Sequence, residues 1–338
     1  MATMRAMQVT KAKGEFELVE RPVPTPGEGQ VRIKVQACGV CHSDVFVKEG
    51  LFPGIKYPRV PGHEVVGTID AVGSGVTRWQ VGQRVGVGWH GGHCFVCDPC
   101  RRGDFIKCAA EKITGLGFDG GYADFMVVGQ EGLAVVPDGL KSAAAAPLLC
   151  AGVTTFNALR NSGARAGDTV AVQGVGGLGH LGVQFARAMG FRTVAISNSE
   201  AKRDLAMKLG AHYYIDGSKQ PPANELRTLG GAKTVLATAP DAKTMSTVIG
   251  GLAADGRLVV VGVSADPIPV APLQIIGKAT GVVGWPSGTA FDSEDTLKFA
   301  ALSGVNTMIE KYPLTKANEA FAHMMSNKAR FRVVLTME

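Results

Sequence analysis

The 338-residue sequence has no apolar run of the roughly 18 residues that a membrane-spanning helix needs. Residues 1–20 carry charges throughout and lack the apolar core of a signal peptide. Lys and Arg are spread along the chain without a clustered basic stripe, so the net charge of +6 does not indicate nucleic-acid binding. The sequence also has no internal repeat and no low-complexity tract. We therefore expect a cytoplasmic protein that binds neither membranes nor nucleic acids.

Charged residues make up only 19% of the chain and apolar residues 46%, which is typical of a folded chain rather than a disordered one. The length suggests two domains of about 150 residues each. Up to about residue 150, Pro and Gly interrupt the chain often, and the patterns at 31–35 and 65–72 predict strands. We expect this part to be β-rich, as a small barrel or twisted sheets.

The pattern changes near residue 153 to an alternation of strands and helices. Strands are expected at 168–173, 193–197, 213–216, 235–239 and 257–262, and helices at 201–209 and 244–252. This order predicts a parallel sheet covered by helices on both faces. Two helices at 293–302 and 316–325 and a strand at 331–335 follow. Because the sheet is complete by about residue 284, we expect this tail to return to the first domain.

A glycine-rich turn follows the first strand of this second part and precedes a helix that extends to Met189. Glycines at the turn would let the backbone approach a pyrophosphate, and the helix N-terminus favours its negative charge. The strand–turn–helix context makes G-x-G-x-x-G a credible dinucleotide motif. Its candidate cofactor-binding residues are Gly174, Gly176, Gly177, Leu178 and Gly179.

The next strand ends without the acid that usually binds the ribose 2′-hydroxyl of NAD. A cation attracts a 2′-phosphate, whereas a carboxylate repels it, so the sequence favours NADP(H) over NAD(H). Alternatively, Lys202 and Arg203 are solvated on a helix and the site accepts either cofactor. The acidic residue Glu200 weakens the argument for NADP. The candidate residues are Ser197, Asn198, Ser199, Lys202 and Arg203.

Four of the seven cysteines lie within fifteen residues, in the spacing C-x2-C-x2-C-x7-C. Such clustering favours metal over disulfides, and four thiolates would fill a tetrahedral shell, as in a structural zinc site. An iron–sulfur cluster or free thiols are the alternatives. The neighbouring His93 is expected to be a surface residue. The four ligands are Cys94, Cys97, Cys100 and Cys108.

Two other stretches, at 38–44 and 61–64, combine thiols, imidazoles and carboxylates, and a further thiol, Cys150, lies far downstream. Two thiolates and one imidazole would leave a fourth tetrahedral position open on Zn²⁺, which is typical of a catalytic site. Cys38 is then the odd cysteine, expected as a small buried residue in a strand.

Together these motifs resemble the zinc-containing alcohol dehydrogenases of the medium-chain dehydrogenase/reductase superfamily, over essentially the full length. The resemblance implies an α/β fold with a GroES-like, β-rich catalytic domain at 1–152, completed by 286–338. It implies a Rossmann domain with a doubly wound parallel sheet at 153–285. The neutral end of the second Rossmann strand resembles the NADP-preferring cinnamyl-alcohol-dehydrogenase branch. A homo-oligomer, tetramer or dimer, is also implied.

The resemblance assigns roles to individual residues. It implies that catalytic zinc is bound by Cys41, His63 and Cys150, which gives two Zn²⁺ per chain with the structural site. Glu64 matches a carboxylate that can bind this zinc transiently, or else forms a salt bridge beneath it. Asp44 matches an acid that orients the zinc-binding histidine.

Further positions match groups that handle protons and the cofactor. Ser43 matches the hydroxyl that hydrogen-bonds the substrate oxygen, with a helix cap as its alternative role. His42 and Arg332 match groups that hold the cofactor pyrophosphate, and Thr154 matches a residue that packs against the nicotinamide. Many relatives end a proton relay with a histidine at the position that is Phe46 here, so the proton must leave by another route.

The implied activity is reversible hydride transfer between a primary alcohol, aromatic or medium-chain, and NADP(H). A polyol or formaldehyde dehydrogenase on the same scaffold and a catalytically silent nucleotide-binding protein are the alternatives. A zinc-finger-like interaction module is disfavoured, because the cysteine loop is embedded in a larger domain. Residues that line the substrate pocket, or else belong to the ordinary core, are Phe46, Trp89, Leu149 and Trp285.

Overall fold

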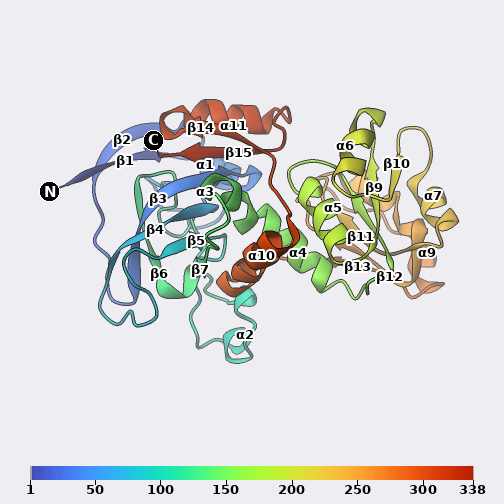
Figure 1. Cartoon of the computed structure of the whole chain (residues 1–338), viewed down its shortest axis with the longest axis horizontal. Coiled ribbons are helices and arrows are strands. Elements are labelled where there is room, and N and C mark those ends of the chain that lie inside the picture. Colours follow the sequence, from blue (N-terminus) through green and yellow to red (C-terminus); the bar gives the residue numbers. More distant parts are fainter. Residues whose placement is uncertain (1, 338) are drawn as a thin grey trace. The chain divides into compact units, whose positions relative to one another are not determined.

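The computed structural model describes residues 2–337, which divide into two compact units. The first unit comprises Met1–Val153 together with Ser287–Glu338, and the second comprises Thr154–Pro286. In Figure 1 the red C-terminal strand β15 (Arg332–Thr336) lies beside the blue strand β3 (Gln30–Val40). The two strands are antiparallel partners, so the first unit joins an N-terminal and a C-terminal segment of the described chain.

The described part of the first unit is organised around a seven-stranded sheet. Its strands follow the order β14-β15-β3-β4-β5-β7, and β6 also pairs with β3. A separate antiparallel pair is formed by β1 (Thr3–Gln8) and β2 (Glu17–Pro22). The remaining strands of the sheet are β4 (Val65–Val72), β5 (Arg84–Val87), β6 (Phe125–Gly129), β7 (Leu133–Val135) and β14 (Ile309–Pro313).

Among the described residues, most helices that lie wholly in the first unit have five residues or fewer. The two longer ones, α10 and α11, belong to the C-terminal tail. The helices of this unit are α1 (Val45–Glu49), α2 (Asp98–Arg101), α3 (Ser142–Ala145), α10 (Ala290–Ser303) and α11 (Ala317–Met325). A further helix, α4 (Ala151–Arg160), begins in this unit and continues into the second.

Within residues 2–337, no single helix is long and apolar enough to cross a membrane. The segments Ser142–Leu149 and Ala151–Arg160 pass that test only as a pair, by length and composition, and they are bent by 53° relative to each other.

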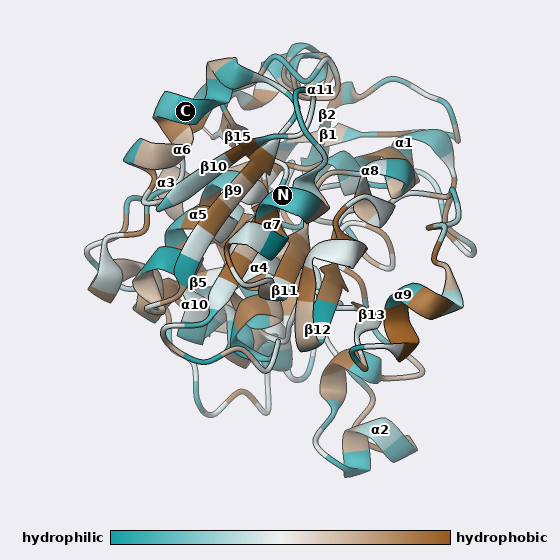
Figure 2. Ribbon diagram, turned by 90° about the vertical axis from the view of Figure 1, so that its right-hand side faces the viewer, coloured by the Kyte–Doolittle hydropathy of each residue, from teal (hydrophilic) through white to brown (hydrophobic). Residues whose placement is uncertain are grey.

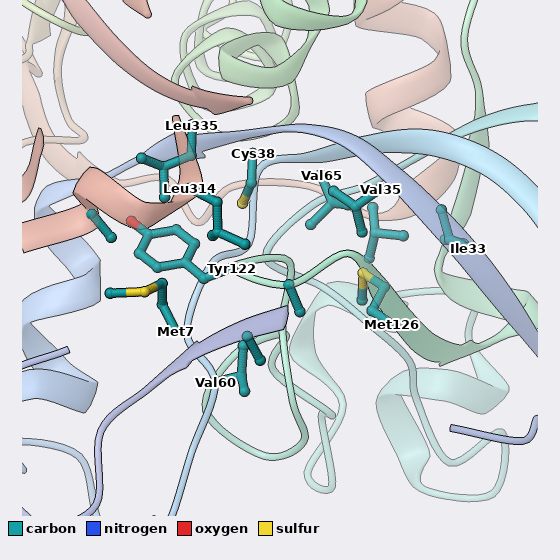
Figure 3. Packing of buried hydrophobic residues seen from close by; sticks show 14 of the residues in the cluster. Met7, Ile33, Val35, Cys38, Val60, Val65, Tyr122, Met126, Leu314 and Leu335 are labelled. Atoms are coloured by element: carbon teal, nitrogen blue, oxygen red, sulfur yellow. The ribbon is translucent and has the colours of Figure 1, made fainter. Parts of the chain in front are cut away.

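The core of the first unit is formed by apolar side chains that the strands point inward. Along β3 the side chains of Val31, Ile33 and Val35 are buried and alternate with less buried ones, as the period of a strand requires. Figure 3 shows Ile33 and Val35 in a cluster with buried residues from distant segments, including Tyr122 and Leu335. The predicted strand at 31–35 is thus the first half of a longer strand, Gln30–Val40.

The second unit contains a parallel six-stranded sheet in the order β10-β9-β8-β11-β12-β13. All five residues of β8 (Thr169–Gln173) are buried, as expected for a parallel strand covered on both faces. In Figure 2, β9 and β11 show the brown of apolar residues, whereas α2 is mostly hydrophilic. The other strands are β9 (Arg192–Ser197), β10 (Tyr213–Asp216), β11 (Ala232–Ala237), β12 (Leu252–Val260) and β13 (Gly281–Gly284).

The predicted helices that extend to Met189 and span 201–209 agree with the structure, but the helices at Pro222–Thr228 and Pro272–Ile276 were not predicted. The prediction of a helix at 244–252 is wrong, because the helix there ends at Ser246, a 3-10 turn occupies Ile249–Gly251 and β12 begins at Leu252. Two consecutive glycines, Gly250 and Gly251, disfavour a continuing helix. The helices are α5 (Gly179–Ala188), α6 (Arg203–Lys208), α7 (Pro222–Thr228), α8 (Ala242–Ser246) and α9 (Pro272–Ile276).

Replacing Leu335 by Ala should lower the free energy of unfolding of the first unit by about 2–5 kcal/mol, because a fully buried side chain of β15 is lost. The matched control is Leu302→Ala, since Leu302 is 86% exposed on α10 and its truncation should change stability by no more than about 0.5 kcal/mol. Calorimetric unfolding checks both variants. Equal effects would contradict the core position of the C-terminal strand.

Candidate metal centre and nucleotide-binding loop

One candidate metal centre lies at an edge of the sheet of the first unit. Strand β3 ends at Val40, and its antiparallel partner β4 begins at Val65, so the residues that follow β3 and precede β4 meet at the same edge. The ligand atoms there all lie within 4.8 Å of one another and belong to Cys41, His63, Glu64 and Cys150.

The donor atoms of this cluster fit a zinc ion. His63 and Glu64 are fully buried, and neither His63 Nε2 nor Glu64 Oε2 has a hydrogen-bond partner among the described residues. Buried polar atoms without a partner are rare in folded proteins and call for an explanation. Two thiols, an imidazole nitrogen and a carboxylate oxygen are donors that Zn²⁺ accepts in tetrahedral geometry.

The two thiols of this centre influence each other. The sulfur atoms of Cys41 and Cys150 are 3.7 Å apart. The hydrogen bond from Cys150, with His63 and Arg332, holds the pKa of Cys41 well below its ordinary value. The same contact with Cys41, together with burial, raises the pKa of Cys150. Cys41 is thus prepared to act as a thiolate, the form that binds metals.

Asp44 supports the imidazole of this centre. Its Oδ1 lies 3.2 Å from His63 Nδ1, and its Oδ2 accepts hydrogen bonds of 2.9 Å from the backbone N–H of Cys41 and from the Tyr122 hydroxyl. Burial lowers the pKa of His63, but Asp44 and Cys41 outweigh it and hold that pKa well above its ordinary value. With Nδ1 facing the carboxylate, Nε2 is the nitrogen available to a metal.

Glu64 forms a buried ion pair with Arg332 of β15. Burial raises the pKa of Glu64 to about 8, although Arg332 opposes the shift. Burial lowers the pKa of Arg332, but Glu64 and the thiols raise it above its ordinary value. Gly39 makes room for this pair, because a Cβ at that position would lie 1.8 Å from Glu64 Oε2. The structure therefore places Arg332 beside the metal centre, and its expected contact with the cofactor pyrophosphate stays a prediction.

His42 and Ser43 belong to a 3-10 turn that follows Cys41 directly. Ser43 is half-buried and His42 is exposed. The N-cap of the following helix α1 is Asp44, so the alternative role of Ser43 as a helix cap is not what the structure shows. The hydroxyl thus lies within two residues of a candidate zinc ligand.

An aromatic surface lies against the imidazole ligand. The ring of Trp89 meets His63 edge-on at 5.0 Å, and Phe46 contacts Trp89 at 6.4 Å. Leu149, by contrast, is fully buried among core residues. Trp285 belongs to the second unit, and its indole nitrogen is buried without a hydrogen-bond partner within residues 2–337. Of the four residues considered for the substrate pocket, the structure therefore places two at the metal centre.

The second candidate metal site is the cysteine loop that contains α2. Its four sulfur atoms lie within 4.8 Å of one another. Backbone N–H groups point at two of these sulfurs: Cys97 donates to Cys94 at 3.4 Å and Ala110 to Cys108 at 3.3 Å. Such contacts lower the pKa of Cys94 to about 6, while burial raises that of Cys100 to about 12. Four thiols without a fifth candidate donor fit a structural zinc site.

His93, expected at the surface, is only 8% exposed, so that prediction is wrong. Its ring stacks on Phe105 with centroids 4.1 Å apart and meets Phe95 at 4.3 Å. His93 Nδ1 lies 3.0 Å from His90, which in turn contacts Glu111 at 2.9 Å. Neighbouring aromatic residues on the loop thus cover a side chain that the sequence alone suggested would be solvated.

The glycine-rich turn of the second unit connects β8 to α5, as predicted. Gly174 has φ of +94°, and a Cβ on Gly179 would lie 1.8 Å from the carbonyl oxygen of Gly174. A Cβ on Gly176 would meet no atom within 4 Å, so the backbone there borders open space, as close approach to a phosphate requires. Gly177 and Leu178 complete the turn and are partly exposed.

The residues after β9 lie beside this turn. Ser197 is buried at the end of the strand, while Asn198 and Ser199 are exposed. Lys202 Nζ donates to the carbonyl oxygen of Val175 in the glycine-rich turn at 3.0 Å. The guanidinium of Arg203 is paired with Glu200.

Tyr214, which the sequence analysis did not single out, makes two contacts with these residues. The Tyr214 hydroxyl donates to the Ser199 carbonyl at 2.5 Å, and Arg203 lies over the Tyr214 ring at 4.9 Å. The alternating pattern at 213–216 predicts the strand but does not indicate which side chains reach the neighbouring turn. Thr154, expected at the nicotinamide, is buried on α4.

Comparisons with known proteins agree with this combination of sites. Residues 27–138 match the alcohol dehydrogenase GroES-like domain, and residues 177–303 match the zinc-binding dehydrogenase family. Alcohol dehydrogenase patD of Penicillium expansum is 44% identical over 320 residues, covering 95% of this chain and 94% of that protein. Aldehyde reductase AdhA of Synechocystis sp. is 35% identical and covers 98% of both chains.

Solved structures of similar fold include cinnamyl alcohol dehydrogenase from Sorghum bicolor, with a TM-score of 0.90 and 32% identity over 99% of this chain and 98% of that one. CAD from Helicobacter pylori complexed with NADP(H) has a TM-score of 0.88 and 26% identity, over 99% and 98%. Acetophenone reductase from Geotrichum candidum in complex with NAD has a TM-score of 0.85 and 26% identity, over 99% and 97%.

Fold, cysteine sites and relatives define a zinc-binding dehydrogenase with a GroES-like and a Rossmann domain. The chain belongs to the zinc-containing alcohol dehydrogenases of the medium-chain dehydrogenase/reductase superfamily. It is a zinc-dependent alcohol dehydrogenase, or aldehyde reductase in the reverse direction.

Replacing Cys41 by Ser should leave one zinc per chain instead of two and abolish turnover, because the catalytic ion loses a thiolate ligand. The matched control is Cys38→Ala, since Cys38 is buried three residues away and belongs to neither sulfur cluster. Elemental analysis of zinc and aldehyde-dependent oxidation of the reduced cofactor check both variants. Wild-type turnover in the Cys41 variant would refute the assignment.

Proposed function

We propose that the enzyme interconverts primary alcohols, aromatic or medium-chain, and the corresponding aldehydes with NADP(H) as the hydride carrier. In this proposal residues 1–152 and 286–338 form the catalytic domain, and residues 153–285 bind the cofactor. The observation that supports the proposal best is the buried cluster of thiols, imidazole and carboxylate in which His63 Nε2 and Glu64 Oε2 lack a hydrogen-bond partner.

When bound, zinc supplies a Lewis acid that polarises a carbonyl or lowers the pKa of an alcohol, and NADP(H) supplies or accepts the hydride. The zinc ligands are Cys41, His63 and Cys150. Asp44 orients the imidazole. Glu64, whose Oε2 has no hydrogen-bond partner, can bind the zinc transiently while water and substrate exchange.

The proton of the alcohol is assigned to the hydroxyl of Ser43, which is half-buried in the turn after Cys41. The aromatic ring of Phe46 cannot relay a proton. The exposed imidazole of His42 neighbours the hydroxyl in sequence, so it is the candidate group for passing the proton to solvent. His42 and Arg332 are also assigned to the cofactor pyrophosphate, and Thr154 to the nicotinamide.

The preference for NADP(H) rests on the residues after β9. Ser197, Asn198 and Ser199 supply hydroxyl and amide groups in place of the carboxylate that would repel a 2′-phosphate. Lys202 belongs to the 3-10 turn that follows β9 and is assigned to the 2′-phosphate; in the structure its Nζ donates to Val175 O of the neighbouring glycine-rich turn. Arg203 is assigned a supporting role, because Glu200 already neutralises part of its charge.

The substrate class rests on the aromatic surface beside the metal centre. Trp89 and Phe46 would contact an apolar group attached to the reacting carbon. Such a surface favours benzyl, cinnamyl or medium-chain alkyl groups over polyols, whose hydroxyls would lose their hydrogen bonds to water. A polyol or formaldehyde dehydrogenase remains the second candidate from the sequence, and a silent nucleotide-binding protein the third.

With cinnamaldehyde or benzaldehyde as substrate, the zinc-loaded protein should oxidise NADPH rapidly and NADH slowly. Absorbance at the nicotinamide band measures each rate, in parallel assays that contain one cofactor at a time. Fast turnover with NADH alone would keep the enzyme class and overturn the cofactor preference. Turnover only with polyols or formaldehyde adducts would favour the second candidate.

Replacing Lys202 by Ala should raise the KM for NADPH about 10–100-fold and leave the KM for NADH nearly unchanged, because the proposed charge-assisted contact of Lys202 with the 2′-phosphate would be lost. The matched control is Lys208→Ala, since Lys208 is exposed on α6 and is expected to leave both constants unchanged. Steady-state kinetics with each cofactor decide. An equal increase for NADPH and NADH would show that Lys202 does not read the 2′-phosphate.

A further inference from the structure

The segment Gly120–Tyr122 ties together two stretches of the metal centre that lie far apart in sequence. Its backbone N–H groups bind the residues just before His63: Gly121 donates to Gly62 O at 2.9 Å and Tyr122 to Pro61 O at 3.0 Å. The position of the ligand His63 thus depends on a segment that contributes no ligand.

The contact between the two segments is too close for side chains on the glycines. A Cβ on Gly62 would lie 2.4 Å from Cδ1 of the Tyr122 ring, and Gly62 has φ of +102°. A Cβ on Gly120 would lie 2.2 Å from the carbonyl oxygen of Gly62. The Tyr122 ring is therefore packed directly against the backbone that precedes His63.

The Tyr122 side chain reaches the other stretch of the centre. It is fully buried, its ring meets Phe16 edge-on at 5.8 Å, and Figure 3 shows it among core residues such as Met7 and Leu314. Its hydroxyl donates to Asp44 Oδ2 at 2.9 Å. Burial and Asp44 raise the pKa of Tyr122 well above its ordinary value, so the hydroxyl remains a donor.

This bond decides how the Asp44 carboxylate is oriented. The backbone N–H of Cys41 and the Tyr122 hydroxyl both donate to Oδ2, and Oδ1 has no hydrogen bond but lies 3.2 Å from His63 Nδ1 as an ion-pair contact. With one donor removed, a single hydrogen bond would hold the carboxylate, and it could rotate away from the imidazole.

We propose that Tyr122 is a positioning residue for the catalytic metal, whose hydroxyl fixes Asp44 so that Asp44 fixes His63. The inference rests on the proposed zinc-ligand set and adds a residue that touches neither metal nor substrate. The competing explanation is that Tyr122 is a core residue whose hydroxyl merely needs an acceptor. The two explanations differ in whether removal of the Tyr122 hydroxyl accelerates the release of zinc from the catalytic site.

The test measures zinc release from the full-length protein into an excess of chelator, with a chromogenic dye as readout. Two phases are expected, and the phase missing in Cys41→Ser belongs to the catalytic ion. In Tyr122→Phe that phase should be about 10-fold faster, the low end of what removal of an outer partner of a ligand usually costs. The phase from the Cys94–Cys108 loop should not change.

Two controls separate the hydroxyl from the packing. Phe16→Leu weakens the ring contact and leaves the hydroxyl, so it should lower the melting temperature without accelerating zinc release. Replacement of Tyr122 by 4-aminophenylalanine keeps a donor and should release zinc at nearly the wild-type rate, whereas 4-methylphenylalanine fills the space without a donor and should match Tyr122→Phe. This pair decides the question even if Tyr122→Phe folds poorly.

Equal release rates for the amino and methyl derivatives would overturn the inference, as would acceleration by Phe16→Leu equal to that by Tyr122→Phe. A failure of the proposed zinc-ligand set is distinguishable, because the wild-type protein would then show a single phase, and a failure of the proposed substrate or cofactor would leave both phases in place. If Tyr122 acts through Asp44, the Tyr122→Phe effect should vanish in an Asp44→Asn background. An additive double variant would contradict that route.

Discussion

The burial of acidic and thiol groups at the β3–β4 edge is the constraint on which the first unit depends. Asp44 and Glu64 are fully buried beside the thiols of the centre, and an uncompensated buried charge is strongly unfavourable. Arg332 supplies one compensating cation from β15, and a metal ion is the compensation that the unpaired donors of His63 and Glu64 call for. The C-terminal tail therefore contributes to the chemistry of the centre as well as to its sheet, through the pairing of β15 with β3.

The second unit depends on a different interaction, in which backbone N–H groups approach an anion closely. Its parallel sheet places the turn after β8 and the turn after β9 at neighbouring carboxyl ends. Glycines at 174 and 179 permit the close turn, and Gly176 faces open space. Lys202 connects the two turns through Val175. Pyrophosphate binding and discrimination at the 2′-position are thus assigned to adjacent loops.

The sequence predicts the fold class and both metal sites because their signals are local or follow a familiar spacing. The strand–turn–helix at 168–189 and the four cysteines at 94–108 are read within short windows, and their predicted arrangements agree with the structure. The environment of His93 could not be predicted in this way, because Phe95 and Phe105 cover it only after the loop folds. The same holds for Tyr122, whose partner Asp44 is 78 residues away, and for the Arg332–Glu64 pair, separated by 268 residues.

Anomalous X-ray diffraction at the zinc absorption edge, from crystals of the purified enzyme, would locate the metal ions directly. Two peaks per chain are expected. One should lie among Cys94, Cys97, Cys100 and Cys108, and the other among Cys41, His63 and Cys150. A single peak in the cysteine loop, with the second cluster free of metal in crystals grown with zinc, would contradict a zinc-dependent reaction at that edge of the sheet.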